Sequence, residues 1–315
     1  MPHSHSSPWW SLTIALPLAF AVTGCNDRKS TAQANETPLP QAEAPAPVDP
    51  SLQPPGIDPA EAKLWKLVWR DEFEGTTFDT SKWDYRYLGP RDGSVMTKDC
   101  VTVENGLCRV WVREKDGVLN NGMISTHHKF EPLYGIVAGR IRFPRMQGQH
   151  GSLWMQPAKP EKIHDNPARS GVEIDIIEWF GERWDAGTAS NLYWPGMKDG
   201  KFDVKANHAG GTKDFKVLPK GELPSDDFHV YSVEWTPKGY IFRMDGKETY
   251  RINEGVSQIP QYLILSLFSA DWEAPRLDRK KLPNSMDVDW VRVWQADSPP
   301  QREFAAEPKP PGAEG

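Results

Sequence analysis

The sequence predicts an all-β protein, built as a sandwich of two antiparallel sheets, and three observations support this prediction. Short segments that alternate apolar with polar residues recur between positions 63 and 296. Turn residues punctuate these segments, and no sustained helical period or internal repeat interrupts them. The stretch is long enough for one large β domain, and such strands bury their apolar faces between two packed sheets.

The expected strands are short and rich in β-branched and aromatic residues. Clear examples are residues 66–70, 108–113, 139–143, 230–235, 240–244 and 286–294. Asp245-Gly246 is a hairpin signal directly after the fifth of these segments. Because such a turn joins antiparallel neighbours, it supports the antiparallel arrangement.

A second hairpin signal, Asn105-Gly106, bears on the two cysteines of the middle region. With a three-residue loop over 104–106, Cys108 lies opposite Thr102, and Cys100 is a diagonal neighbour on the same face. This register does not favour a disulfide, although an exported protein permits one, and two free buried thiols are the alternative. The spacing of the cysteines does not indicate a zinc site.

The two ends of the chain differ in composition from the middle. Residues 12–22 form an apolar run too short to span a bilayer, so residues 1–25 are predicted to be a secretory signal peptide. Val22-Thr-Gly-Cys25 resembles a bacterial lipobox, which implies lipidation of Cys25, although residues 1–10 contain no Lys or Arg. Residues 26–62 and 297–315 are proline-rich and are expected to be a disordered tether and tail.

This N-terminus predicts an exported protein. It is expected to be a lipoprotein anchored through Cys25 in the membrane of the bacterial cell envelope, with free secretion as the alternative; Asn26 indicates the outer membrane if the host is Gram-negative. The net charge of −6, from 37 basic and 43 acidic residues, offers no basic footprint for nucleic acid. The 14 tryptophans suit either sugar stacking or a β core. We expect a monomer.

Three carboxylates, Glu173, Asp175 and Glu178, stand close together in the apolar run Gly-Val-Glu-Ile-Asp-Ile-Ile-Glu-Trp-Phe. A helix would scatter them around its axis, whereas a strand points the first two to one face. Glu178 would face the other way unless one extra residue, a β-bulge around Ile176-Ile177, turned it back. The spacing therefore predicts a bulged strand with three acids on the same face.

Charged groups in so apolar a run are costly unless they share a water-filled groove or a chemical task. Two carboxyl groups that flank a bond are the machinery of glycoside hydrolysis. The alternative is an ordinary antiparallel strand whose polar face is solvated.

Five segments, in this order, resemble glycoside hydrolase family 16. They are residues 69–83, 134–144, 173–178, 228–235 and 287–294. The resemblance implies a β-jelly roll, concanavalin-like, whose concave sheet forms the cleft, and hydrolysis with retention of configuration. It assigns Glu173 as the nucleophile, Glu178 as the general acid/base, and Asp175 as a hydrogen-bond partner of the nucleophile.

These roles imply a protonation pattern. Like charges so close raise one another's pKa values, so the three carboxyls are expected to titrate as a coupled set. Glu178 is expected to be protonated, so that it can donate to the leaving oxygen, and Glu173 to be ionised.

The spacing Glu-x-Asp-x-x-Glu belongs to the bulged branch of the family, which includes endo-β-1,3-glucanases and hydrolases of marine galactans. The resemblance thus predicts a retaining endo-glycoside hydrolase of an extracellular β-glycan, with β-1,3-glucan as the first candidate and no catalytic cofactor. The alternatives are an agarase- or carrageenase-like galactan hydrolase, a transglycosylase, a non-catalytic sugar-binding jelly roll and a structural envelope lipoprotein. The intact acidic triplet argues against the sugar-binding jelly roll, because binding alone needs no acid/base pair.

The resemblance also indicates a set of substrate-binding residues around the acids. They are His150, Trp154, Asn191, Tyr193, Trp194 and Trp272. Trp154 offers a flat apolar face to a sugar, with core packing as the alternative. His150, Tyr193 and Ser266 depart from the residues usual in the family, which leaves the identity of the sugar open.

A structural calcium ion occurs in many members of the family. The matching ligands here would be Glu72, the carbonyl of Gly106 and Asp289, since calcium prefers hard oxygen ligands. The alternative is that the two acids are ordinary surface carboxylates.

Overall fold

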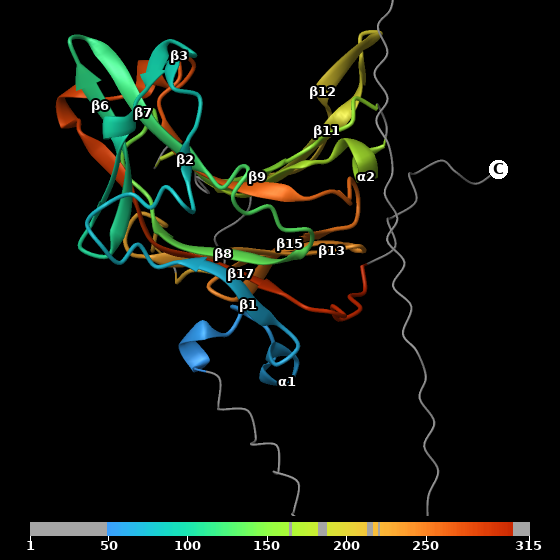
Figure 1. Ribbon diagram of the computed structural model, residues 1–315. Helices are drawn as coiled ribbons and strands as arrows, with labels where there is room; N and C mark the ends of the chain where they lie inside the picture. Colours follow the sequence, from blue (N-terminus) through green and yellow to red (C-terminus); the bar gives the residue numbers. More distant parts are fainter. Residues whose placement is uncertain (1–48, 164–165, 182–187, 213–216, 220, 305–315) are drawn as a thin grey trace, which may run out of the picture. The chain divides into compact units, whose positions relative to one another are not determined.

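The computed structural model describes residues 49–163, 166–181, 188–212, 217–219 and 221–304 (Figure 1). Nearly all regular structure within these residues is β-strand, as the sequence predicts. The predicted signal peptide, Cys25 and tether residues 26–48 lie outside the described residues. No helix in the described part of the chain has the length and apolarity needed to cross a bilayer.

The elements are short strands joined by turns and single helical turns. The strands are β1 (Lys66–Asp71), β2 (Asp84–Tyr85), β3 (Gly89–Arg91), β4 (Ser94–Met96), β5 (Val101–Glu104), β6 (Leu107–Lys115), β7 (Val118–Ser125), β8 (Gly135–Arg142), β9 (His150–Pro157), β10 (Glu173–Trp179), β11 (Thr188–Lys198), β12 (Lys201–Thr212), β13 (His229–Thr236), β14 (Gly239–Met244), β15 (Lys247–Ile252), β16 (Gln261–Phe268) and β17 (Asn284–Gln295). The helical turns are α1 (Pro59–Ala62), α2 (Pro167–Ser170), η1 (Pro50–Leu52), η2 (Lys98–Cys100), η3 (Ala274–Arg276) and η4 (Arg279–Lys281).

The strands form two layers that share one strand (Figure 1). The inner layer, which contains the acidic strand, has the order β12-β11-β10-β9-β16-β7-β2 and is antiparallel throughout. The outer layer has the order β15-β14-β13-β8-β17, and the far edge of β17 pairs with β1 and β6. β7 belongs to both layers, because residues 118–121 pair with β6 and residues 122–125 pair with β16.

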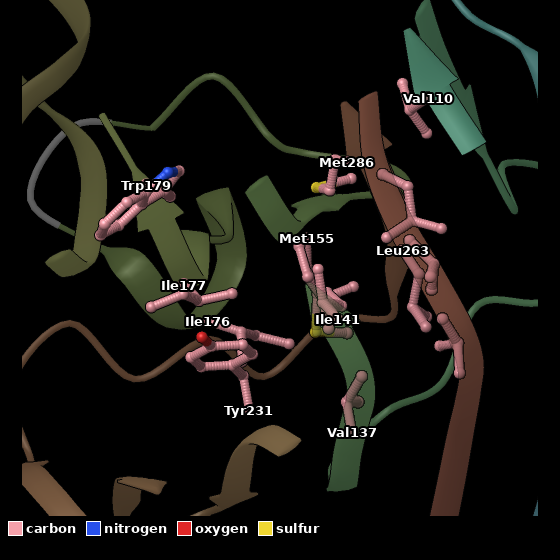
Figure 2. Packing of buried hydrophobic residues seen from close by; sticks show 14 of the residues in the cluster. Val110, Val137, Ile141, Met155, Ile176, Ile177, Trp179, Tyr231, Leu263 and Met286 are labelled. Atoms are coloured by element: carbon pink, nitrogen blue, oxygen red, sulfur yellow. The ribbon is translucent and has the colours of Figure 1, made fainter. Parts of the chain in front are cut away.

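The core lies between the two layers and follows the two-residue period of the strands. Leu263, Leu265 and Leu267 of β16 are fully buried in one cluster with apolar side chains of β8, β13 and β17. Figure 2 shows part of this cluster, including Ile176 and Ile177 of the acidic strand. Each such side chain stabilises the fold by about 1.5–3 kcal/mol on burial. The predicted sandwich is confirmed, and the other face of the inner layer remains available for function.

The hairpin between β5 and β6 is tighter than predicted. Glu104 pairs with Leu107, so the loop contains only Asn105 and Gly106. Both loop residues have positive φ, at 54° and 73°. A two-residue turn with positive φ at both positions matches the twist of the strands, and asparagine and glycine tolerate it best.

The shorter loop changes the neighbours of the cysteines. Cys108 lies opposite Val103 rather than Thr102, so the predicted register is wrong by one residue. Cys100 and Cys108 are both buried and unbridged, which confirms the alternative of two free thiols.

The domain begins earlier than the composition of the tether predicts. The main-chain carbonyls of Ser51 and Leu52 accept hydrogen bonds from Arg292 and Trp294 of β17, at 2.7 and 2.8 Å. Ala62 is buried. The tether prediction is therefore wrong for residues 49–62, because polar partners on β17 satisfy the backbone of this proline-rich segment.

The domain also ends later than predicted. Arg302 donates to the buried Glu234 at 2.6 Å and to Glu61 at 2.9 Å. The ring of Phe304 lies against Gly239 at the start of β14. Residues 297–304 thus belong to the folded domain, and the predicted disordered tail is wrong for them.

Candidate active site

The acidic strand β10 has the predicted bulge. The register with β11 shifts between Asp175 and Glu178, and the register with β9 shifts between Asp175 and Ile177. Ile176 and Ile177 both enter the core (Figure 2), so Glu178 returns to the face of the other acids. Cross-strand pairing places Trp154 of β9 and Asn191 of β11 opposite Asp175 on this face.

Both oxygens of Glu173 are held by hydrogen bonds. Gln156 Nε2 donates to Oε2 at 2.8 Å, and Lys205 Nζ of β12 donates to Oε1. Gln156 is held in turn by Tyr262, whose hydroxyl donates to Oε1 of the amide at 3.0 Å, and by Arg86. Glu173, the predicted nucleophile, therefore forms an ion pair with Lys205, and its hydrogen bonds fix the orientation of its carboxylate.

Glu178 is held by a different set of partners. His150 Nε2 lies 2.8 Å from Oε1, and the Asn191 amide donates to Oε2. The His150 ring stacks on Phe180 and contacts Phe268, with centroid separations of 4.5 and 4.8 Å. This apolar setting fixes the imidazole against the carboxyl group.

The pKa shifts within the triplet differ in direction from those expected. Burial, together with the charges of Glu178 and Glu173, raises the pKa of Asp175 well above its ordinary value. Burial also acts to raise the pKa of Glu178, but the hydrogen bond and charge of His150, with Asn191 and Lys205, outweigh it and lower that pKa. The carboxyl whose pKa is raised is therefore Asp175 rather than Glu178, the reverse of the direction expected for Glu178.

Asp175 lies at the centre of the triplet and is almost completely buried. Its Oδ2 has no hydrogen-bond partner among the described residues. The hydrogen bond from Asp175 to the nucleophile stays a prediction.

Replacement of His150 by phenylalanine is expected to shift the basic limb of the kcat/KM profile to higher pH. His150 of β9, Asn191 of β11 and Lys205 of β12 lower the pKa of Glu178, while its burial opposes them. Removing His150 raises that pKa, so the acid form required for the first step persists to higher pH.

The measurement is kcat/KM from about pH 4 to pH 9, with each variant shown to be folded. His150→Gln, which keeps a donor but no charge, should shift the limb less than His150→Phe. A limb that stays in place or moves to lower pH in His150→Phe would contradict this role.

The other predicted substrate-binding residues differ in how much of their side chains they can offer to a sugar. Tyr193 stacks on His208 beside the acids, and burial with the charge of Glu178 raises the pKa of its phenol to about 12, so the hydroxyl stays neutral. Trp272 is 52% exposed and meets Phe268 edge to face. Trp154 is on the acidic face but only 8% exposed, and donates to Ser266 at 3.1 Å, which limits the ring face it can offer.

Trp194 does not belong to this face. It follows Tyr193 in β11, and successive strand residues point to opposite sides. Its ring lies against Gly255 and packs on the core cluster. The prediction that Trp194 binds substrate is therefore wrong in this structure.

The sequence reasoning missed four residues of the site. They are Gln156, Lys205, Arg86 and Tyr262. Gln156 could have been predicted, because it lies two residues after Trp154 in the same strand, so the two side chains point to the same face of the sheet. The other three come from strands or loops distant in sequence, and no local pattern marks them.

The residues proposed for calcium do not fit such a site. Glu72 forms a two-pronged ion pair with Arg292, with both contacts at 2.8 Å. Asp289 pairs with Arg140 at 2.7 Å. A cation would have to displace both guanidinium groups, which already neutralise these acids.

A pocket of about 580 Å³ opens beside the nucleophile. Its lining includes Glu173, Gln156, Tyr193, Lys205 and Tyr262. This volume is in the range of sites that bind small molecules. A larger cavity of about 960 Å³, near Arg142 and Asp287, contains none of the three acids.

Two differently held carboxylates beside a pocket, on one face of an all-β sandwich, are an arrangement suited to glycoside hydrolysis. Comparison with family models refines this inference. The model "Glycosyl hydrolases family 16" matches residues 92–292, and the chain belongs to that family. The family resemblance of the sequence is thereby confirmed.

Individual relatives are more distant. The chain is 29% identical over 279 residues to "Glucan endo-1,3-beta-glucosidase A1" of Niallia circulans, covering 76% of this chain and 39% of that protein. It is 27% identical over 261 residues to "Beta-glucanase" of Rhodothermus marinus, covering 75% and 87%. The chain thus spans about two fifths of the length of the first relative.

A solved structure shows the same fold. The laminarinase from Rhodothermus marinus superposes with a TM-score of 0.61 at 23% sequence identity, covering 74% of this chain and 98% of that one. The predicted jelly-roll sandwich is confirmed by this likeness.

Proposed function

We propose that this chain is a retaining endo-glycoside hydrolase that cleaves a β-linked polysaccharide outside the cytoplasm. The observation that carries the proposal is the pair Glu173 and Glu178, placed on one face by the bulge and held by different partners. Unequal environments are what the two roles require, because one carboxyl must attack while the other exchanges a proton.

In the first step an oxygen of Glu173 attacks the anomeric carbon while the bond to the leaving oxygen breaks. Glu178 gives its proton to that oxygen, so no charged alkoxide is released. The reaction needs the carboxyl groups about 5–5.5 Å apart, so that one can reach the carbon and the other the leaving group. The Glu173 oxygen that does not attack remains available to the Gln156 or Lys205 donor.

In the second step the ester between Glu173 and the sugar is cleaved. Glu178, now ionised, takes a proton from water, and the water oxygen displaces Glu173 from the anomeric carbon. Glu178 thereby regains its proton. Two inversions give net retention of configuration.

For the substrate, β-1,3-glucan is the first candidate. The names of the two relatives, a glucan endo-1,3-β-glucosidase and a β-glucanase, support a β-glucan. The deciding experiment is a panel of β-glucans and galactans, with products separated by size and the anomer followed by NMR from the first turnover. Internal cleavage with retained configuration supports the proposal; binding without any product would favour a sugar-binding protein.

We also propose export, with lipid attachment at Cys25 and a monomeric enzyme. The support is the apolar run of residues 12–22 followed by Val22-Thr-Gly-Cys25. Expressed in a bacterial host, the chain should partition with membranes, and Cys25→Ser should release it. Equal partitioning of both forms would argue against the anchor. Sedimentation of the released form tests the monomer.

A further inference from the structure

The pocket beside the nucleophile has an unusual charge for a site that would bind a neutral glycan. Two permanent cations, Arg86 and Lys205, line it, and Glu173 is the one acid among its described lining residues. The rings of Tyr87, Tyr193 and Tyr262 form much of its wall. Aromatic rings suit the faces of sugars generally, so they do not explain the cations.

Arg86 has no carboxylate partner within the described part of the chain. Among the described residues, every arginine other than Arg86 and Arg113 has a carboxylate within 4.0 Å. The Arg86 guanidinium instead donates to the Tyr87 hydroxyl at 2.7 Å and to Gln156. It stacks over Tyr87 and Tyr262, at 4.1 and 5.0 Å from the ring centroids.

This arrangement holds the guanidinium ready for a ligand. Its Nε is buried and has no hydrogen-bond partner among the described residues. Aromatic rings on the guanidinium and the bond to Gln156 restrict its rotation, which reduces the entropy lost on binding. A half-buried guanidinium without a counter-ion is a natural partner for a sulfate or carboxylate group.

The positive charge of Lys205 offsets the repulsion between Glu173 and an anionic ligand in the pocket. Its ammonium pairs with Glu173 and lies 4.8 Å from the centroid of the Tyr193 ring. The negative charge of the nucleophile is therefore balanced within the pocket. In the proposed mechanism Glu173 becomes an uncharged ester, and Arg86 and Lys205 then both face the pocket without an acid.

We propose that this pocket binds a sugar residue bearing an anionic group, a sulfate ester or a carboxylate, and that Arg86 is its principal ligand. The inference rests on the proposed glycosidase function and names the substrate class of that site. It does not depend on whether the backbone is a glucan or a galactan. A neutral sugar would leave the charge of Arg86 uncompensated in the bound state.

The test uses substrates that differ only in the anion: neutral β-1,3-glucan, its sulfated and carboxymethylated forms, and a sulfated galactan before and after desulfation. We expect kcat/KM to be about 10–100-fold higher for an anionic form, the size of a charge-assisted hydrogen bond. The sulfated and carboxymethylated arms identify which anion is preferred. The preference should weaken as ionic strength rises.

Arg86→Gln is the matched variant, because it keeps a donor for Gln156 but loses the charge. It should lower the ratio of anionic to neutral kcat/KM about 10-fold or more. Arg113→Gln is the control: Arg113 also stacks on an aromatic ring and has no carboxylate partner among the described residues, but does not line the pocket. It should leave the ratio unchanged.

The outcomes separate this inference from the proposed function. Anion recognition is overturned if every neutral polysaccharide is cleaved as fast as its anionic form or faster. It is also overturned if Arg86→Gln leaves the ratio of anionic to neutral kcat/KM unchanged. Either result leaves the proposed hydrolysis intact.

If no polysaccharide is cleaved, the proposed hydrolysis is wrong. Anion recognition is then tested by binding: the electrophoretic mobility of the Glu178→Gln variant is measured in gels that contain each polysaccharide. Anion recognition is supported if the anionic polysaccharide slows the variant more than the neutral one, and if this difference disappears in the double variant Glu178→Gln/Arg86→Gln. Equal slowing by both polysaccharides overturns it.

Discussion

Glu173→Ala is expected to abolish turnover of polysaccharide, lowering kcat by about 10⁴–10⁶-fold, the range seen when a covalent catalytic centre is dismantled. The variant lacks the oxygen that attacks the anomeric carbon, and Gln156 and Lys205 lose the group they hold. Added azide should restore turnover by entering the space that the side chain leaves. The product should be a glycosyl azide of inverted configuration, because a single displacement replaces the two natural ones.

The control for this experiment is Glu248→Ala, which removes an acid of β15 paired with Arg251. That variant should keep its activity, since the outer layer is remote from the acidic face. Full activity of Glu173→Ala, or azide products of retained configuration, would contradict the assignment of the nucleophile.

Glu178→Ala should have a different signature. Loss of proton transfer is expected to reduce kcat for polysaccharide by about 10²–10⁴-fold. Aryl glycosides with good leaving groups need no proton, so their first step should survive and the glycosyl-enzyme should accumulate. Azide should then attack this ester and give a glycosyl azide of retained configuration.

The opposite stereochemistry of the two azide products distinguishes the roles within one assay. Mass spectrometry of the quenched Glu178→Ala enzyme should show the sugar attached to the peptide that contains Glu173. An adduct on another residue, or equal loss of activity for good and poor leaving groups, would rule out Glu178 as the acid/base.

The acidic strand shows how much of the site a local pattern can specify. Alternation and the spacing of Glu173, Asp175 and Glu178 were sufficient to predict the bulge, because the period of a strand is fixed by backbone geometry. The strands themselves were equally predictable, since each buries one face. The family resemblance added the roles, which no spacing could supply.

What the sequence left undetermined is the set of contacts between distant segments. Lys205 reaches Glu173 only because β12 pairs beside β11, and Arg86 reaches Gln156 from the loop after β2. The pKa of Glu178 depends on such contacts, so the local spacing of the acids does not give its direction. The error in the domain ends has the same origin, because proline-rich composition does not reveal partners such as Trp294.

Strand β7 couples the stability of the two layers. One half of it is hydrogen-bonded to β6 and the other half to β16, so neither layer can detach without breaking a strand that the other layer uses. The sandwich should therefore melt as a single cooperative unit, with equal calorimetric and van't Hoff enthalpies. The slowest-exchanging amides should include those of residues 118–125, on both sides of the point where the strand passes from one layer to the other.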